Sequence, residues 1–346
     1  MSKKIKIMLF ILLPVLLSSF VLNAQTYKEE NISFQTDNWE LSGLLIKPNS
    51  EPPYPVVILV HGDGPWDCRG FGFYQFLWKA FTDAGFACLS WDKPGVGNST
   101  GIYNRSKIME ERSDVLLASV KYLKERNDID TKRIGLWGIS QAGWVMPLAI
   151  SKSEDIWFMI AVSCAGENSI EQSAYLLKQQ LICEGLLEDE ATKYADLFKK
   201  RSYAKTYEEY LENAKPLSEQ VYIKSTLKWG GITSEENFVP YTGPDNNFYF
   251  DPVKILETIK FPLLVIFGEK DTQIDIKQSE EAYRKALTRA GNTEFTIKVF
   301  PNADHTITFS ETGCMKESDE RLANNKIEIA PGYLETMRDW LKNLKL

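Results

Sequence analysis

Histidine is scarce in this sequence, which has only two among its 346 residues, His61 and His305. A zinc site needs several nitrogen or sulfur ligands at short, characteristic spacings, and two histidines so far apart do not supply them. The sequence therefore predicts neither a metal ion nor another cofactor. The scarcity also narrows the search for a general base, because histidine fills that role most often.

Cysteine is also sparse, and its distribution excludes a fold held together by many disulfides. Five cysteines are too few and too scattered for such a scaffold. Cys88 and Cys164 lie in apolar, strand-like runs, where a cysteine usually acts as a small buried hydrophobic residue. One disulfide remains open in an oxidising compartment, although spacing alone does not name the pair. The five are Cys68, Cys88, Cys164, Cys183 and Cys314.

The sequence has no apolar run of the roughly 20 residues that a membrane-spanning helix needs. The apolar stretch of residues 7–22 follows three lysines near the N-terminus and ends just before Ala24. This pattern predicts a signal peptide of residues 1–24 with cleavage after Ala24, and hence a secreted or periplasmic protein. An uncleaved anchor helix is the alternative.

A basic run is absent as well. Lysine and arginine number 40 against 47 aspartate and glutamate residues, so the formal net charge is −7. Loss of residues 1–24 would remove three lysines and no acid, which takes the net charge from −7 to −10. An acidic chain without a basic patch is a poor partner for nucleic acid or an anionic membrane. We therefore expect neither as a partner, and no stable membrane insertion once the signal peptide has been removed.

Apolar runs and amphipathic segments alternate along the rest of the chain. Residues 31–36 and 39–46 alternate in polarity on either side of a turn, which predicts a β-hairpin. Residues 55–60 (PVVILV) are continuously apolar, as expected for a strand buried on both faces. This organisation predicts an α/β fold with a mostly parallel central sheet flanked by helices. Further strands are predicted at 86–91, 133–137, 156–163, 262–267 and 293–300, and helices at 72–84, 111–126, from 141 onward, 276–290 and 332–344.

The alternation is interrupted between Ser163 and Pro262. The 98 intervening residues far exceed the roughly 30 of a normal βαβ unit. Much of the excess has helix-forming composition. We therefore predict an inserted, largely helical cap of residues 167–250 over the carboxyl edge of the sheet, where ligands bind in such folds, and a core of residues 25–166 and 251–346. A packing insertion unrelated to substrate is the alternative.

One serine stands at a position that suits a nucleophile. In Gly138-Ile139-Ser140-Gln141-Ala142-Gly143, Ser140 follows a predicted buried strand and precedes a predicted helix. A sharp strand-to-helix turn there would expose the hydroxyl and leave neighbouring amides unused. Small residues at 138 and 142 suit a turn that brings backbone segments together. The pattern alone is weak, because most such serines only cap a helix.

The other members of a triad follow later in the chain. His305 comes after the last predicted strand, so it lies at the same edge of the sheet as Ser140 and is the candidate base. Asp271 follows the strand 262–267 at that edge and is the candidate acid that orients the imidazole. The order Ser140, Asp271, His305, each just after a strand, predicts a catalytic triad. The rival acids are Glu269 and Asp275, and less so Asp304, whose side chain should diverge from the adjacent histidine.

A tetrahedral oxyanion also needs preorganised N–H donors. The amide of Gln141 directly follows the candidate nucleophile, and the loop His61-Gly62-Asp63-Gly64 offers a second donor in the amide of Asp63. A carboxylate facing the oxyanion would oppose its charge, so we expect the Asp63 side chain to turn away, with Arg69 as a candidate partner. His61 is expected to brace this loop rather than to act as a base.

These segments resemble the α/β-hydrolase superfamily. The resemblance is carried by the nucleophile turn, by residues 61–65 (HGDGP), by residues 92–101 (DKPGVGNSTG) and by the order of Asp271 and His305. It covers most of residues 30–346 and points to capped, secreted bacterial esterases related to the dienelactone hydrolase and acyl-peptidase branches. The resemblance implies the α/β-hydrolase fold and short to medium acyl esters as the substrate class.

Together these residues predict a serine hydrolase that transfers an acyl group to water through an acyl-enzyme intermediate. The predicted partner is a small-molecule ester. A serine peptidase of the same fold, similar to aminopeptidases or acyl-peptidases, is the main alternative, although no residue singles out a site for a substrate amine. An inactive hydrolase-fold binding protein is disfavoured because all three triad residues are present. The sequence leaves the oligomeric state open.

Overall fold

The computed structural model describes residues 27–103, 108–223, 230–242 and 249–345. The predicted signal peptide, residues 1–24, and its cleavage site lie outside these residues. The signal peptide therefore stays a prediction. Among the described helices, none is both long and apolar enough to cross a membrane.

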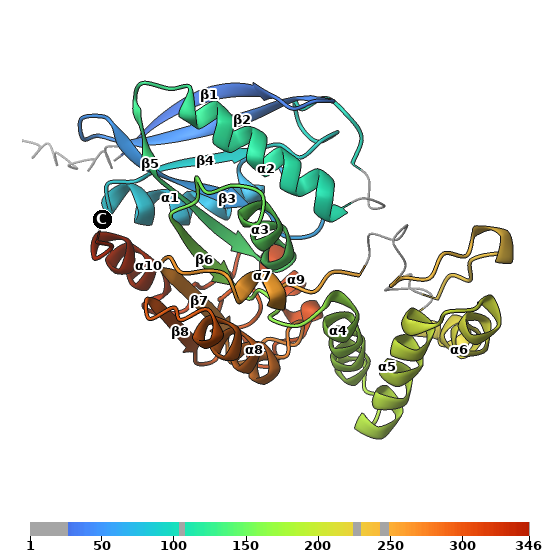
Figure 1. Ribbon diagram of the computed structural model, residues 1–346. Helices are drawn as coiled ribbons and strands as arrows, with labels where there is room; N and C mark the ends of the chain where they lie inside the picture. Colours follow the sequence, from blue (N-terminus) through green and yellow to red (C-terminus); the bar gives the residue numbers. More distant parts are fainter. Residues whose placement is uncertain (1–26, 104–107, 224–229, 243–248, 346) are drawn as a thin grey trace, which may run out of the picture.

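The strands of the described residues form one eight-stranded sheet in the order β1-β2-β4-β3-β5-β6-β7-β8 (Figure 1). β1 (Tyr27–Gln35) and β2 (Glu40–Pro48) form the predicted hairpin, and β2 is also antiparallel to β4 (Ala87–Trp91). The other neighbouring strands are parallel, which confirms the predicted sheet. They are β3 (Tyr54–Val60), β5 (Ile129–Ile139), β6 (Phe158–Val162), β7 (Leu263–Gly268) and β8 (Phe295–Phe300).

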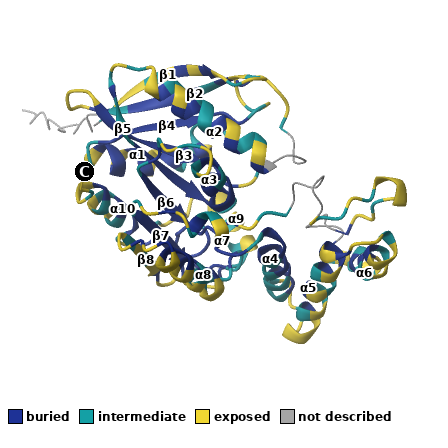
Figure 2. Cartoon of the chain, in the orientation of Figure 1, coloured by how far each residue is buried: buried dark blue, intermediate teal, exposed yellow. Residues whose placement is uncertain are grey.

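Helices cover both faces of the sheet, so β3 is buried along its whole length (Figure 2). Val56 and Ile58 pack in one core with α2, α3 and α8, whereas Val57 and Leu59 pack in a second core with α1 and α10. Burial on both sides is the reason that this strand is continuously apolar. The five helices are α1 (Tyr74–Asp83), α2 (Ile108–Lys124), α3 (Ala142–Ile150), α8 (Ile276–Arg289) and α10 (Tyr333–Lys342).

The predicted insertion between β6 and β7 is largely helical in its described part. Helices α4, α5 and α6 share apolar contacts, including those of Leu177, Phe198 and Leu217. In Figure 1, α4 lies beside the core, while α5 and α6 extend away from the sheet. Whether residues 167–250 act as a cap stays a prediction. The elements are α4 (Ser169–Cys183), α5 (Glu188–Tyr203), α6 (Tyr207–Glu219), a 3₁₀ turn (Glu235–Asn237) and α7 (Val253–Leu256).

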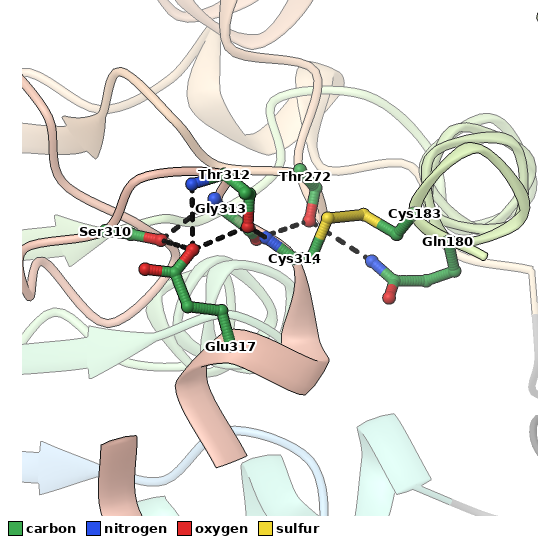
Figure 3. The surroundings of a disulfide bond; sticks show 8 residues. All are labelled: Gln180, Cys183, Thr272, Ser310, Thr312, Gly313, Cys314 and Glu317. Atoms are coloured by element: carbon green, nitrogen blue, oxygen red, sulfur yellow. Dashed lines mark hydrogen bonds between the residues drawn. A yellow bond between two sulfur atoms is a disulfide. The ribbon is translucent and has the colours of Figure 1, made fainter. Parts of the chain in front are cut away.

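A disulfide joins the insertion to the core. It links Cys183, the last residue of α4, to Cys314, which precedes the unpredicted helix α9 (Met315–Ala323) (Figure 3). Beside it, Gln180 Nε2 donates to Thr272 Oγ1 at 3.1 Å, and Thr272 Oγ1 donates to the Gly313 carbonyl at 2.7 Å. Thus α4 is held to the loops that follow β7 and β8.

Loss of this disulfide is expected to lower the free energy of unfolding by about 3 kcal/mol, because a crosslink between distant residues restricts the unfolded chain. The two cysteines are 131 residues apart. The check is thermal unfolding of the double variant Cys183→Ser/Cys314→Ser, with and without a reductant. The reductant should lower the melting temperature of the wild type toward that of the variant.

The same reductant should leave the melting temperature of the double variant unchanged, so the variant serves as the control for the reductant. The cysteines that remain in it, Cys68, Cys88 and Cys164, are free. Cys88 and Cys164 are buried among apolar side chains, as predicted. Equal melting temperatures for oxidised wild type and variant would contradict a stabilising disulfide.

Candidate active site

Ser140 lies in a strained turn between β5 and α3. Its backbone is left-handed, with φ 59°, a conformation that costs a non-glycine residue on the order of 1–3 kcal/mol. Ser140 N donates to the Val162 carbonyl of the neighbouring strand at 3.0 Å, which helps to hold the turn. A Cβ added to Gly138 would lie 2.6 Å from the Ala142 Cβ, so both positions must stay small. The structure therefore has the sharp strand-to-helix turn that the sequence predicts.

Asp271 and His305 meet where the chain leaves β7 and β8. His305 Nδ1 lies 2.8 Å from Asp271 Oδ2, and both side chains are buried. Asp271 Oδ1 accepts hydrogen bonds from the backbone N–H groups of Gln273 at 2.7 Å and Ile274 at 3.0 Å. With the carboxylate held in this way, the proton of a neutral His305 belongs on Nδ1. Nε2 then has the free electron pair that a general base needs.

The surroundings of His305 favour its protonated form. Burial lowers its pKa, but the charge and hydrogen bond of Asp271 and the charge of Asp304 together raise it more. The net result is a pKa above the ordinary value of 6.5. A histidine with a raised pKa becomes a stronger base once it is neutral.

The rival carboxylates have other roles in the structure. Glu269 accepts from the backbone N–H of Asn302 at 3.0 Å, and Asp275 caps α8 by accepting from the N–H of Gln278 at 3.0 Å. Asp304 accepts from the backbone N–H of Thr306 at 2.9 Å and so shapes the turn that carries His305. In the described part of the chain, no group of three or more such acidic, histidine or cysteine side chains could hold a metal ion.

Ser140 and the Asp271–His305 pair lie at the carboxyl edge of four consecutive parallel strands, β5 to β8. Among the described residues, no hydrogen bond joins Ser140 Oγ to His305. Such bonds are often long in an enzyme without substrate and tighten when substrate binds. The structure thus brings acid and base together and places the serine at the same edge. The triad itself stays a prediction.

The loop after β3 lies against the Ser140 turn. A Cβ added to Gly62 would be 3.5 Å from Ser140 Cβ. His61 is buried in this loop, with Nε2 at 2.7 Å from the Trp91 carbonyl and Nδ1 at 2.7 Å from the Tyr74 hydroxyl. Burial and the nearby charges of Lys93 and Arg112 hold the pKa of His61 well below its usual value. A neutral imidazole with both nitrogens occupied matches the expected bracing role.

The Asp63 side chain contacts a different partner from the one that the sequence suggests. Tyr103 donates its hydroxyl proton to Asp63 Oδ1 at 3.2 Å and accepts from the Gly64 N–H at 3.0 Å. Arg69 instead pairs with Glu29 at 2.8 Å, so the expected contact between Arg69 and Asp63 is wrong. Arg69 is thus engaged by a carboxylate of β1, whereas a tyrosine of the loop after β4 bonds to Asp63.

Comparisons with known proteins cover much of the chain at low sequence identity. The sequence profile of the prolyl oligopeptidase family matches residues 219–323, which include Asp271 and His305. Esterase EstD of Thermotoga maritima is 25% identical over 295 residues, which cover 83% of this chain and 62% of that protein. An esterase structure from Pyrococcus furiosus matches with a TM-score of 0.55 at 18% identity and covers 91% of each chain. An acylaminoacyl peptidase structure from Pyrococcus horikoshii matches with a TM-score of 0.56 at 16% identity, over 93% of this chain and 43% of that one.

These similarities support a serine hydrolase in general terms, because the named relatives are esterases and peptidases. They do not select a substrate, since one fold hosts many activities. The two structural matches extend over 91% and 93% of this chain, whose described strands form one mostly parallel eight-stranded sheet. The chain therefore has the α/β-hydrolase fold, as the resemblance in its sequence implies.

Proposed function

We propose that this protein is a serine hydrolase that cleaves carboxylic esters, with Ser140 as nucleophile, His305 as base and Asp271 as the group that orients the base. One observation carries the proposal. The strained Ser140 turn and the buried His305–Asp271 pair lie at the same edge of the sheet, although they come from strands far apart in sequence. Geometry and roles, rather than sequence spacing, are what define such a triad.

In the proposed mechanism, Ser140 Oγ attacks the ester carbonyl while His305 Nε2 takes the hydroxyl proton. The carbonyl oxygen becomes an oxyanion that accepts hydrogen bonds from the backbone N–H groups of Gln141 and Asp63. Among the described residues, the N–H of Gln141 has no other partner. His305 then gives its proton to the leaving alcohol. Water attacks the acyl-enzyme with help from the same base and restores Ser140.

The proposed substrate class comes from the resemblance of the sequence to capped esterases, which implies short to medium acyl esters. We therefore propose esters of short to medium acyl chains as substrates.

A panel of nitrophenyl esters tests this reading. We expect kcat/KM to be at least about tenfold higher for the butyrate than for the dodecanoate, because a site suited to short and medium acyl chains gains little from the extra methylenes of a long one. Purified protein would be assayed against acetate, butyrate, octanoate and dodecanoate esters under the same conditions. Values of kcat/KM that rise steadily with acyl chain length would contradict the proposed substrate class but not the proposed triad.

Peptide hydrolysis is the second candidate, and the match of residues 219–323 to the prolyl oligopeptidase family favours it. The same triad would serve, but the leaving group would be an amine. Aminoacyl nitroanilides in the same assay separate the two readings. Activity confined to the anilides would select the peptidase.

Under either reading we propose that the chain is exported, on the strength of the predicted signal peptide, and that residues 167–250 form a cap.

A further inference from the structure

Two cations, Lys93 and the partly buried Arg112, hold the backbone of the loop after β3. Lys93 Nζ donates to the carbonyl oxygens of Gly62 at 2.6 Å and Gly64 at 2.7 Å, and the lysine is only 3% exposed. The Arg112 guanidinium, on α2, donates to the carbonyl oxygen of His61. A buried charge is costly unless hydrogen bonds compensate for it. Here three carbonyl groups of a single loop supply part of that compensation.

These carbonyl contacts determine where the loop's N–H groups point. A peptide unit is planar and trans, so its C=O and its N–H lie on opposite sides. With the Gly62 carbonyl held on Lys93, the N–H of Asp63 points away from Lys93. With the His61 carbonyl held on Arg112, the N–H of Gly62 points away from Arg112. The Asp63 N–H is one of the two donors proposed for the oxyanion.

Arg112 reaches the other proposed donor as well. Its guanidinium also donates to Oε1 of Gln141, the residue whose backbone N–H follows Ser140. One side chain therefore contacts both halves of the proposed oxyanion hole, the loop after β3 and the nucleophile turn. Since Gly62 packs against Ser140, a shift of the loop would change the spacing of the two donors.

The same geometry excludes a direct chemical role for Lys93. Its amine lies on the carbonyl side of the Gly62–Asp63 peptide, whereas a substrate oxygen bound by the Asp63 N–H lies on the opposite side. The aromatic ring of Tyr103 lies 5.6 Å from the amine and adds a further contact. Lys93 can therefore act on the reaction through the peptide, not through the substrate.

We propose that Lys93 and Arg112 are positioning residues that hold the oxyanion-binding N–H groups of Asp63 and Gln141 in place. This inference rests on the proposed serine hydrolase function. Oxyanion stabilisation depends on donors that are already aimed at the place where charge develops. Loss of either cation should therefore slow the formation of the tetrahedral intermediate more than it weakens substrate binding.

The test compares Lys93→Met, Lys93→Arg and Arg112→Met with the wild type. Lys93→Met keeps the length and apolar stem of the side chain but removes its donors, and it is expected to lower kcat for nitrophenyl butyrate by about 100-fold. KM should stay within about threefold of the wild-type value, because the lost interaction acts in the transition state. Lys93→Arg restores donors and should recover at least part of kcat. Lys132→Met, the same change at an exposed lysine, is the matched control.

A second substrate separates positioning from general damage to the fold. In the thiono ester of the same acid, sulfur replaces the carbonyl oxygen and is a weaker hydrogen-bond acceptor. Its turnover should depend less on the oxyanion hole, so Lys93→Met should reduce the preference for the oxygen ester. Equal losses for the two esters, or a kcat in Lys93→Met close to the wild-type value, would overturn the proposal.

Two further measurements keep the outcome decisive. Arg112→Met removes the second cation independently. Lack of a cooperative unfolding transition in Lys93→Met would mean that this variant is not folded, and Arg112→Met then decides the outcome. An unchanged preference for the oxygen ester in Arg112→Met overturns the proposal. Ser140→Ala is assayed in parallel. Ester hydrolysis that survives in Ser140→Ala would refute the proposed function, whereas hydrolysis that needs Ser140 but not Lys93 or Arg112 would refute only the positioning role.

Discussion

Replacing Ser140 with alanine is expected to lower kcat for ester hydrolysis by about 10⁶-fold, to the level left by substrate binding and the oxyanion donors. The reason is that the hydroxyl is the only group at the strained turn that can form the acyl-enzyme. The turn itself should survive, because alanine is no larger than serine and the hydrogen bonds that hold the turn come from the backbone. Turnover of nitrophenyl butyrate and labelling with a fluorophosphonate measure the loss.

The chain supplies a matched control for this substitution. Ser163 follows the neighbouring strand β6, is also left-handed with φ 45°, and is fully buried. Its hydroxyl has no hydrogen-bond partner within the described residues. Ser163→Ala makes the same change in a similar backbone conformation one strand away, so kcat should stay within about threefold of the wild type. Fluorophosphonate labelling of Ser140→Ala at the wild-type rate would show that another residue is the nucleophile.

Much of the fold can be predicted from the hydrophobic pattern, because a strand buried on both faces of a parallel sheet is continuously apolar. The run of residues 55–60 predicts β3 almost to its ends, and the alternation of strands and helices predicts the sheet. Which strands lie next to each other cannot be predicted from such a pattern. That β4 lies between β2 and β3 depends on how crossovers pack in three dimensions, and no local pattern records it.

The candidate site, too, has features that the sequence predicts and features that depend on tertiary packing. The order of Ser140, Asp271 and His305 after their strands suffices to predict that they share an edge, and the structure joins the last two by a hydrogen bond. The pairing of Cys183 with Cys314 could not be predicted, because residues 131 apart meet only through tertiary packing. Helix α9 was missed because it is short and none of its residues is buried, so packing against the core does not require an apolar pattern in it.

Lys93 and Arg112 were missed for a related reason. A lysine or arginine in a sequence is expected to be solvated, and nothing local distinguishes one whose charge is buried against backbone carbonyls. The only available clue is position. Lys93 directly follows the acidic residue after β4, and Arg112 lies on the first turns of a helix at the same edge. Both facts gain meaning only once the loop after β3 is placed beside them.

Replacing Asp271 with asparagine is expected to lower kcat/KM by about 10⁴-fold and to move its pH dependence. The proposed mechanism needs neutral His305, so kcat/KM of the wild type should rise with pH around a midpoint above 6.5, since the pKa of His305 is raised. Burial lowers that pKa, whereas the charge and hydrogen bond of Asp271 and the charge of Asp304 raise it. Without the Asp271 charge the midpoint should move to lower pH, even as the maximum rate falls.

The fall in rate and the shift of midpoint have separate causes, which makes the pair of measurements stringent. An asparagine amide can bond to Nδ1 with either its oxygen or its nitrogen, so it no longer fixes the proton on that atom, and Nε2 loses its role as base. Asp275→Asn is the matched control, because Asp275 caps α8 and asparagine caps helices equally well. Its pH profile should match that of the wild type. A midpoint that stays in place in Asp271→Asn but falls in Asp275→Asn would assign the acid to Asp275 and overturn the proposed triad.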